Sequence, residues 1–421
     1  MPHRITIVSG LQVTDNPRVV KEADALAEMG HAVTVLGAVW SAESLPRIDK
    51  LIAHRRWRHV PVVDLSDRSA GNRLRMTVLR AAATVARAAR TGLGIEHPLQ
   101  LGFPVLPLWR AARSVPTDLY SLHLPKALWV GLRLQALGRP FRIDIEDWYS
   151  EDGLPADRAK RPLALMRRAE DVLLNAAVHA TTTSEALAYG LSERYGCPLP
   201  LVIYNSFPLA ERSTMDGLRR DRGDDHGPSI TWFSQTIGPG RGLETLLAAF
   251  EALPETAVLH LRGAPRPGYL EALLAPLPAT ARGRVFIHPQ VPQDELLSRL
   301  AEHDIGYCGE LSYPLNRDLT ITNKTFEYMR ARLAVVASDT VGQREVAAAA
   351  PGAISIFRQG DAGSLLEALR PLVDRPERLA EARQAALEAL ALHFSWESSK
   401  LRMQRQVATH FGETWSAEAG A

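Results

Sequence analysis

The sequence predicts an α/β protein built from two similar halves, each with a mostly parallel sheet. Short apolar segments that fit buried strands alternate with longer segments of helical periodicity along almost the whole chain. This alternation stops in the polar, aperiodic stretch 207–228 and then begins again. A chain of 421 residues is long enough for two or three domains, each with its own core.

The first half begins with Ile5–Ser9, a short apolar segment that fits a buried parallel strand. The helix that follows has clear boundary signals: Asn16 fits the N-cap, Pro17 the first position and Gly30 the end. Its inward side is expected to carry Val19, Ala23 and Leu26. Further strands are expected at His31–Leu36, Asp118–Leu122, Phe141–Ile145 and Leu201–Tyr204, and further helices at Arg161–Val178 and Ser184–Tyr195.

The second half repeats the pattern with a strand at Ser229–Phe233 and a helix at Leu243–Leu253. Its remaining strands are expected at Val258–Leu261, Val285–His288, Ile305–Cys308 and Val335–Ser338, and 375–412 is helical in pattern. Ligands in parallel sheets bind at the carboxyl ends of strands, so we expect a cleft between the two halves. The predicted domains are 1–206, a linker at 207–228, 229–395, and a C-terminal helix and tail at 396–421 that packs back on the first domain.

Composition excludes several classes of protein. The net charge of +2 provides no global field that would favour nucleic acid. The two cysteines, Cys197 and Cys308, lie far apart without metal-ligand spacing, which favours buried, reduced thiols in a cytoplasmic protein. The first ten residues lack a signal-peptide apolar region, and no run of about 18 apolar residues suggests a membrane span.

The segment Asn323–Met329 predicts a helix that begins at an anion. Thr322 or Asn323 can cap it, and Phe326 and Met329 follow at helical spacing. Lys324 lies in the first turn, where the helix dipole disfavours a cation unless an anion binds there as well. Glu327 follows about one turn later and could accept hydrogen bonds from sugar hydroxyls. The alternative is an ordinary capped helix with a solvated lysine and glutamate.

A glycine-rich loop, Gly238–Gly242, lies between a predicted strand and a predicted helix. Glycines let the backbone approach a phosphate, and Arg241 could hold a diphosphate with two hydrogen bonds. The loop matches neither the dinucleotide-binding pattern nor the Walker loop. A tight turn between strand and helix is the alternative.

Four segments together resemble family-4 glycosyltransferases with the GT-B fold. The segment 322–339 (TNKTFEYMRARLAVVASD) resembles the donor site of that family, and 237–250 (IGPGRGLETLLAAF) resembles its phosphate loop. The segments 15–37 and 181–206 resemble its first βαβ unit and the end of its N-terminal domain. The four lie in the family's order and extend over nearly the whole chain.

This resemblance implies two Rossmann-like domains whose parallel sheets face each other across a cleft. It implies transfer of a sugar from a nucleotide diphosphate sugar, with retention of configuration and without a metal or other cofactor. The acceptor is expected to be a saccharide or lipid-linked saccharide, in the synthesis of cell-surface polysaccharide or glycoconjugate. The enzyme is expected in the cytoplasm, with a peripheral position at the inner face of the plasma membrane as a further expectation.

The resemblance also assigns roles to residues. Arg241 and Lys324 match the residues that hold the diphosphate, and Glu327 matches the partner of the ribose hydroxyls. His123 matches a histidine beside the reacting sugar, although a lone histidine after a strand is often structural. The expected catalytic residues are His123, Arg241 and Lys324, and the expected nucleotide-binding residues are Gly238, Gly240, Arg241, Asn323, Lys324 and Glu327.

One departure from the family leaves the donor sugar open. Leu319 stands where many members carry a glutamate that is assigned to that sugar. This supports one alternative, a catalytically inactive module that binds sugar nucleotides; a second alternative is a sugar-nucleotide epimerase of similar architecture. Glu310, Asn316 and Asp318 could contact the donor sugar, or could be solvated loop residues.

The strand end Asp144–Asp147 gathers three carboxylates, which also suit Mg²⁺ or Mn²⁺. The double α/β pattern does not fit the other glycosyltransferase fold, which uses such a site, so we predict no metal. An acceptor-side role for Glu146 or Asp147 and a capping or ion-pair role both remain open.

The stretch 68–93 predicts a basic amphipathic helix that contains no acidic residue. Arg73, Arg80 and Arg87 are seven residues apart and share one side of the helix, while an apolar side carries Leu74, Val78, Val85 and Leu93. This pattern suits an anionic membrane surface, and a solvated surface helix is the alternative. Nucleic acid is disfavoured because the helix has no aromatic residue.

Overall fold

The computed structural model describes residues 2–222 and 227–415, which divide into two compact units. The first unit comprises Met1–Thr183, Leu187–Ile203 and Lys400–Ala421, and the second comprises Ser184–Ala186 and Tyr204–Ser399. Residues 223–226 of the expected linker and 416–421 of the expected tail lie outside the described residues. The rest of the expected linker belongs to the second unit, where 209–214 form a short 3₁₀ helix.

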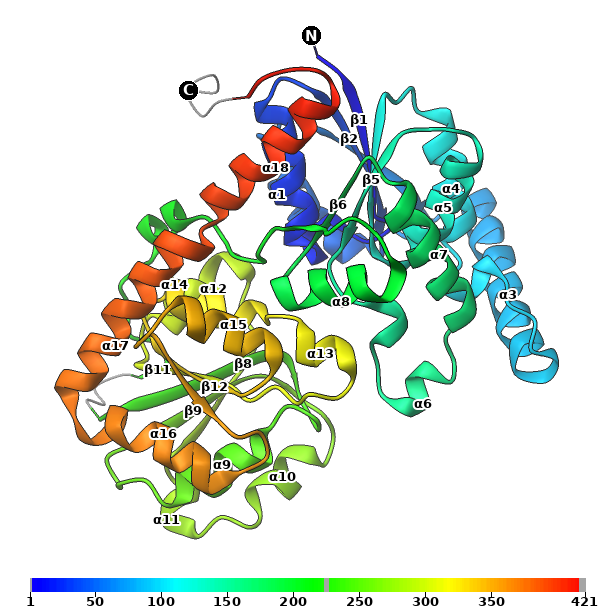
Figure 1. Ribbon diagram of the computed structural model, residues 1–421. Helices are drawn as coiled ribbons and strands as arrows, with labels where there is room; N and C mark the ends of the chain where they lie inside the picture. Colours follow the sequence, from blue (N-terminus) through cyan, green and yellow to red (C-terminus); the bar gives the residue numbers. More distant parts are fainter. Residues whose placement is uncertain (1, 223–226, 416–421) are drawn as a thin grey trace. The chain divides into compact units, whose positions relative to one another are not determined.

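The first unit is a seven-stranded parallel sheet with the strand order β3-β2-β1-β4-β5-β6-β7 (Figure 1). Its strands are β1 (Arg4–Val8), β2 (Ala32–Val39), β3 (Arg58–Asp64), β4 (Leu119–His123), β5 (Phe141–Ile145), β6 (His179–Thr182) and β7 (Leu201–Val202). The helices between the strands are α1 (Pro17–Glu28), α2 (Leu45–Ile52), α3 (Ala70–Leu93), α4 (Val105–Ser114), α5 (Leu124–Ala136), α6 (Pro155–Arg158), α7 (Leu163–Ala176) and α8 (Glu185–Tyr195).

The predicted boundaries of α1 are confirmed. The Asn16 side chain caps the helix by accepting hydrogen bonds from the backbone N–H groups of Arg18 and Val19, at 3.1 and 3.2 Å. Pro17 is the first helical residue, and Gly30 follows the helix with a φ of +82°. The expected inward side is fully buried in the core of this unit: Val19, Ala23 and Leu26.

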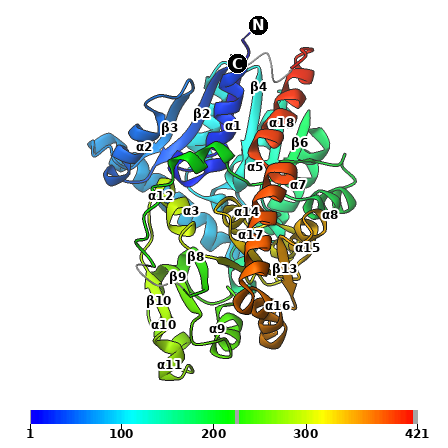
Figure 2. The ribbon, with the colours of Figure 1, turned by 90° about the vertical axis from the view of Figure 1, so that its left-hand side faces the viewer.

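The last helix of the chain, α18 (Trp396–His410), packs against α1 (Figures 1 and 2). Gln404 donates a side-chain hydrogen bond to the Ala25 carbonyl at 2.8 Å, and the Lys400 ammonium lies 2.8 Å from the Glu28 carboxylate. Val407 is buried in the same core as α1. From Lys400 onward this helix therefore belongs to the first unit.

The second unit is a six-stranded parallel sheet with the order β10-β9-β8-β11-β12-β13. Its strands are β8 (Ser229–Ile237), β9 (Val258–Pro265), β10 (Val285–His288), β11 (Ile305–Cys308), β12 (Ala334–Ser338) and β13 (Ile354–Phe357). Its helices are α9 (Leu243–Glu251), α10 (Tyr269–Leu274), α11 (Ala279–Arg282), α12 (Gln293–Leu300), α13 (Leu315–Leu319), α14 (Asn323–Arg330), α15 (Val341–Ala349), α16 (Ala362–Asp374) and α17 (Pro376–Ala389), followed by a π-helical turn at Leu390–Phe394.

Each sheet has a point where the strand order reverses. In the first unit it lies between β1 and β4, and in the second between β8 and β11. The connections that leave the two central strands run to opposite sides there, so a crevice opens at their carboxyl ends. His123 ends β4, and the loop Gly238–Gly242 follows β8. The fold thus places a predicted site at the reversal point of each sheet.

None of the helices in the described parts of the chain is both long and apolar enough to cross a membrane.

Candidate functional site

The glycine-rich loop after β8 is held close to the backbone that follows β11. Gly240 and Gly242 adopt φ values of +72° and +68°, which side chains disfavour. A Cβ at Gly242 would lie 2.3 Å from the Gly309 carbonyl oxygen, so no larger residue fits. Tyr307 from β11 donates its hydroxyl to the Gly242 carbonyl at 2.7 Å. The loop is therefore held in one conformation by its glycines and by this contact with β11.

Helix α9 begins directly after this loop without a capping side chain. The N–H groups of its first turn therefore have no side-chain acceptor, and they carry the positive end of the helix dipole. An anion placed at the loop would accept hydrogen bonds from them.

Three cations surround a single carboxylate beside the loop. The Lys324 ammonium lies 2.6 Å from Glu310, and both side chains are largely buried. Burial would raise the pKa of Glu310, but Lys324, Arg241 and Arg317 together hold that pKa below its usual value. Arg317 also donates to the Gly240 carbonyl at 2.9 Å. With Glu310 ionised, this group of four carries a net charge of +2.

The start of α14 is as predicted. Thr322 is the N-cap, and its hydroxyl oxygen accepts from the Lys324 N–H at 3.4 Å; the Lys324 ammonium lies 3.3 Å from the same oxygen. Asn323 is exposed at the helix N-terminus. The Lys324 side chain thus folds back to Glu310 rather than extending into solvent.

Glu327 is buried in an ion pair. One carboxylate oxygen accepts from Arg330 at 2.7 and 3.1 Å, and the other accepts from the Gln293 amide of α12 at 3.4 Å. Its side chain is 1 % exposed. Ribose hydroxyls would have to reach a side chain that is almost fully buried, so the role of Glu327 stays a prediction.

The loop before α14 is tied into the second unit. Asp318 accepts from the Val341 N–H at the start of α15, at 3.2 Å, and Asn316 is buried. The Leu319 carbonyl accepts from the Ser184 hydroxyl at 2.6 Å. Asp318 therefore has a capping role, and of the three candidates for the donor sugar Glu310 lies nearest to the predicted phosphate residues by its contacts.

In the first unit, His123 is fully buried between three carboxylates. Its Nε2 lies 3.0 Å from Glu22, and its Nδ1 lies 3.1 Å from Glu146 and 3.3 Å from Asp144. Burial would lower the pKa of His123, but Glu22 and then Asp144 and Glu146 raise it well above its ordinary value. Both ring nitrogens therefore donate, and the ring is an imidazolium.

Two arginines complete this buried charge network. Arg18 holds Asp144 through two hydrogen bonds, at 2.5 and 2.8 Å, and donates to the Ile203 carbonyl at 2.6 Å. Arg142 pairs with Glu22, whose pKa falls to about 2 because this guanidinium and His123 outweigh the effect of burial. The network contains the cations Arg18, Arg142 and His123 and the anions Glu22, Asp144 and Glu146.

Glu146 is the member of this network that reaches solvent, with 15 % of its side chain exposed. Asn16 donates to the same carboxylate oxygen as His123, at 3.2 Å. The ligand atoms of His123, Asp144 and Glu146 lie within 4.8 Å of one another, a spacing that a metal ion could use. A cation there would have to displace Arg18 from Asp144 and deprotonate His123. The absence of a metal requirement stays a prediction.

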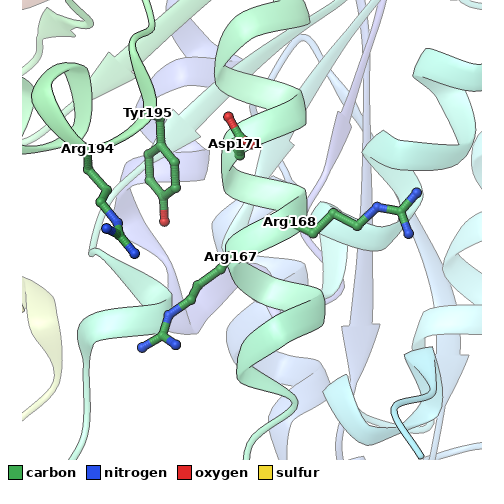
Figure 3. Close-up of a pocket in the computed structure, with 5 residues that line it drawn as sticks. All are labelled: Arg167, Arg168, Asp171, Arg194 and Tyr195. Atoms are coloured by element: carbon green, nitrogen blue, oxygen red, sulfur yellow. The ribbon is translucent and has the colours of Figure 1, made fainter.

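A shallow basic hollow of about 470 Å³ lies elsewhere on the first unit, between α7 and the end of α8 (Figure 3). Arg167 and Arg194 extend toward the side of α7 on which Tyr195 lies, whereas the guanidinium of Arg168 extends to the other side (Figure 3). Arg167 is already paired with Glu151 at 2.9 Å. The hollow contains none of the predicted site residues.

Sequence reasoning missed Arg18, Glu22 and Arg142 in the first unit and Arg317 in the second. A signal was present for Arg142, which alternates with apolar residues and Asp144 in a fully buried strand. Charged residues at buried positions require partners. Arg18 and Glu22 lie on the same helix as the predicted inward residues. For Arg317, the sequence offers no signal beyond its position between Asn316 and Asp318, which were considered as contacts of the donor sugar.

Comparison with solved structures shows the fold. HepE from Anabaena, in complex with UDP, shares 15 % identity with a TM-score of 0.68, covering 97 % of this chain and 100 % of the other. The sucrose-phosphate synthase of Thermosynechococcus elongatus shares 15 % identity with a TM-score of 0.66, covering 97 % and 99 %. A UDP-forming α,α-trehalose-phosphate synthase from Burkholderia xenovorans shares 14 % identity with a TM-score of 0.66, covering 97 % of this chain and 99 % of the other.

With its two parallel sheets and these neighbours, the chain has the GT-B fold of two Rossmann-like domains. No protein-family model matches the sequence, and no curated protein matches it. Membership of glycosyltransferase family 4 therefore stays a prediction. A protein of Listeria monocytogenes assigned as a UDP-N-acetylglucosamine 2-epimerase also shares the fold, at 13 % identity and a TM-score of 0.58, covering 99 % and 98 %.

Proposed function

We propose that this protein transfers a sugar from a nucleotide diphosphate sugar to an acceptor. The observation that carries this proposal is the group of Arg241, Arg317 and Lys324 around Glu310, beside a fixed glycine loop and an uncapped helix N-terminus. A diphosphate needs close peptide N–H groups and an excess of positive charge, and this group supplies both. Neighbours of the same fold include HepE bound to UDP and to UDP-glucose, which supports a nucleotide sugar as the donor.

The same cations would also assist the chemical step. Negative charge develops on the diphosphate as the bond to the sugar breaks, and fixed cations stabilise that charge without reorganisation. Before the nucleotide binds, Glu310 neutralises part of the charge of Lys324. A bound diphosphate would share this lysine with Glu310, so Lys324 contributes to binding less than an unpaired cation would.

In the first unit we assign the acceptor to the neighbourhood of Glu146. The supporting observation is that Glu146 is partly exposed while His123 and Asn16 fix its orientation. A carboxylate held in this way can accept a hydrogen bond from an acceptor hydroxyl. His123 would then act as a positioning residue through Glu146, because its own nitrogens are occupied.

The finer parts of the proposal come from the family resemblance. We propose that the reaction retains anomeric configuration, needs no metal, and uses a saccharide or lipid-linked saccharide acceptor for cell-surface polysaccharide or glycoconjugate. Proton NMR of the product identifies the anomer, and turnover that persists in excess EDTA supports the metal-free reaction. An inverted product or complete loss of turnover with EDTA contradicts the respective part.

Calorimetric titration with UDP, GDP and ADP tests the nucleotide site. Arg241→Ala and Lys324→Ala should each weaken the preferred nucleotide by about 10- to 100-fold, since a charge-assisted hydrogen bond contributes about 1.5–3 kcal/mol. Arg378→Ala is the matched control, because this exposed arginine of α17 pairs only with Glu381 among the described residues. Unchanged affinity in both site variants would reject the assignment.

Two other functions are separated by product analysis. The epimerase neighbour and the buried pairing of Glu327 keep open an epimerase or an inactive sugar-nucleotide-binding module. An epimerase changes the nucleotide sugar without an acceptor, an inactive module binds it without turnover, and a transferase releases nucleoside diphosphate in proportion to glycosylated acceptor. Epimerised nucleotide sugar as the sole product would replace the proposal.

A further inference from the structure

Helix α3 is apolar on two opposite sides. Its inward side packs against Leu99 and Val105 of the first unit through Ala83 and Ala86. Its outward side is apolar as well, although a surface helix normally presents polar residues there. This outward stripe consists of Leu74, Val78 and Val85, which are 68, 58 and 68 % exposed, together with the exposed Ala81 and Ala88.

An arginine row follows one flank of the outward stripe. Arg73, Arg80 and Arg87 lie seven residues apart and are exposed. Within the described parts of the chain none of the three forms an ion pair; Arg80 lies 5.4 Å above the Phe103 ring, and Arg87 donates to the Thr84 hydroxyl at 3.0 Å. No acidic residue occurs between positions 68 and 93. The whole surface is therefore both apolar and positively charged.

A second copy of the chain is a poor occupant for this surface. The outward stripe repeats at alternating spacings of four and three residues, as in a pair of packed helices. Pairing α3 with itself would, however, bring one arginine row toward the other with no carboxylate on either helix to compensate. Like charges at the flanks of a helix pair disfavour it. Charge complementarity instead requires an anionic partner that also accepts aliphatic side chains.

We propose that α3 binds the surface of an anionic lipid bilayer. Leu74, Val78 and Val85 would enter the boundary between headgroups and acyl chains, while Arg73 and its two partners in the row contact lipid phosphates. Figure 1 shows α3 at the outer edge of the first unit. Because no helix of the described chain can span a bilayer, the attachment is peripheral. This inference does not depend on the proposed reaction.

Co-sedimentation with vesicles tests the proposal with the full-length protein. Vesicles of phosphatidylcholine alone are compared with vesicles that contain about one third phosphatidylglycerol. The parent should bind only the anionic vesicles, and less as salt is raised. Replacing Arg73, Arg80 and Arg87 together by glutamine should lower the partition coefficient about 100-fold, since each basic residue near such a surface contributes about five-fold.

A matched control removes the same charge elsewhere. Arg370, Arg375 and Arg378 are exposed in the second unit, and replacing all three by glutamine should change vesicle binding little. A third variant, with Leu74, Val78 and Val85 replaced by glutamine, keeps every arginine and should still lose at least about 10-fold, because apolar burial is lost. Thermal unfolding of all variants should match the parent, since these side chains are exposed.

Each other outcome overturns the proposal. No binding of the parent to anionic vesicles, or equal losses in the control and the arginine-row variant, removes the lipid assignment. Sedimentation velocity that shows a dimer abolished by the glutamine changes at Leu74, Val78 and Val85 would make the stripe an interface between copies. Single-stranded DNA that binds as tightly as the anionic vesicles would make the arginine row a general polyanion site.

Discussion

Replacing His123 by glutamine is expected to destabilise the first unit strongly. The imidazolium lies between Glu22, Asp144 and Glu146, and its side chain is fully buried. Glutamine keeps hydrogen-bonding capacity but removes the charge, which leaves three carboxylates beside the two cations Arg18 and Arg142. Removing one partner of a buried ion pair costs about 3–5 kcal/mol, because an uncompensated charge remains buried.

That cost converts into a thermal shift. In a unit of about 150–250 residues, 1 kcal/mol lowers the melting temperature by about 2–4 °C, so His123→Gln should lower it by about 6–20 °C. Differential scanning calorimetry measures the shift. Nucleotide affinity should be unchanged, because the residues proposed to bind the diphosphate lie in the other unit.

A double-variant cycle separates charge balance from loss of packing. Glu146→Gln alone should cost less than His123→Gln, because water reaches the partly exposed Glu146. The double variant restores two cations and two anions, so its loss should be smaller than the sum of the single losses. Additive losses, or a shift below about 2 °C for His123→Gln, would refute the buried imidazolium.

The pH dependence of this pair follows from the raised pKa of His123. A raised pKa in the folded protein stabilises it fully below the unfolded value of about 6.5, and this contribution is lost as pH rises through the folded pKa. The difference in melting temperature between parent and His123→Gln should therefore be largest near pH 6 and narrow at strongly alkaline pH. A difference that grows with pH would contradict the assignment.

Three further predictions concern the second unit. Glu327→Gln should reduce nucleotide affinity about 10-fold. Removing the 2′-hydroxyl of the nucleotide should then cost less affinity in the variant than in the parent. An equal loss in both proteins, measured by calorimetry, excludes the ribose contact. Glu310→Gln removes the carboxylate that pairs with Lys324, so it should tighten nucleoside diphosphate binding several-fold, as measured by calorimetry. A fall in nucleotide-sugar affinity would instead indicate that Glu310 holds the donor sugar. Burial, followed by the charges of His303 and His288, lowers the pKa of His260 to about 2. The free energy of unfolding should therefore fall as pH drops below about 6.5. His260→Phe should lessen this loss by about 1–3 kcal/mol in urea unfolding at pH 4.

Much of the fold was predictable because the central strands are apolar and the helices carry local boundary signals. Phe141–Ile145, Val285–His288 and Ile305–Cys308 are strands with the predicted bounds. Three strands were missed. Two of them, β3 and β13, lie at sheet edges, and the third, β6, is an internal strand whose sequence HATT is short and mostly polar. An edge strand is paired on one side only, so its sequence is less constrained; β3 even contains Pro61, which a central strand would not tolerate.

The site residues were predictable where chemistry follows a local pattern and not where it depends on tertiary contacts. The glycine loop and the helix start at Thr322 are encoded within a few residues. The pairing of Lys324 with Glu310 joins positions 14 apart, and that of Arg18 with Asp144 joins positions 126 apart. Nothing in the local sequence states that His123 has no free nitrogen. The pairing of both ring nitrogens with carboxylates, which limits the predicted contact with a sugar, can be seen only in the folded sheet.

The charged groups at the two reversal points differ in net charge, and this difference fits different roles in the proposed reaction. Beside the glycine loop, three cations surround Glu310 and leave an excess of positive charge that an incoming anion can neutralise. At the end of β4, three cations and three anions cancel, so the network offers no net charge to a ligand. A balanced, buried network fixes geometry, and its single partly exposed carboxylate, Glu146, becomes a directed hydrogen-bond acceptor. If the proposed function is correct, the first arrangement would bind the diphosphate of a nucleotide sugar and the second would orient an acceptor hydroxyl, which are the two tasks that sugar transfer to an alcohol requires.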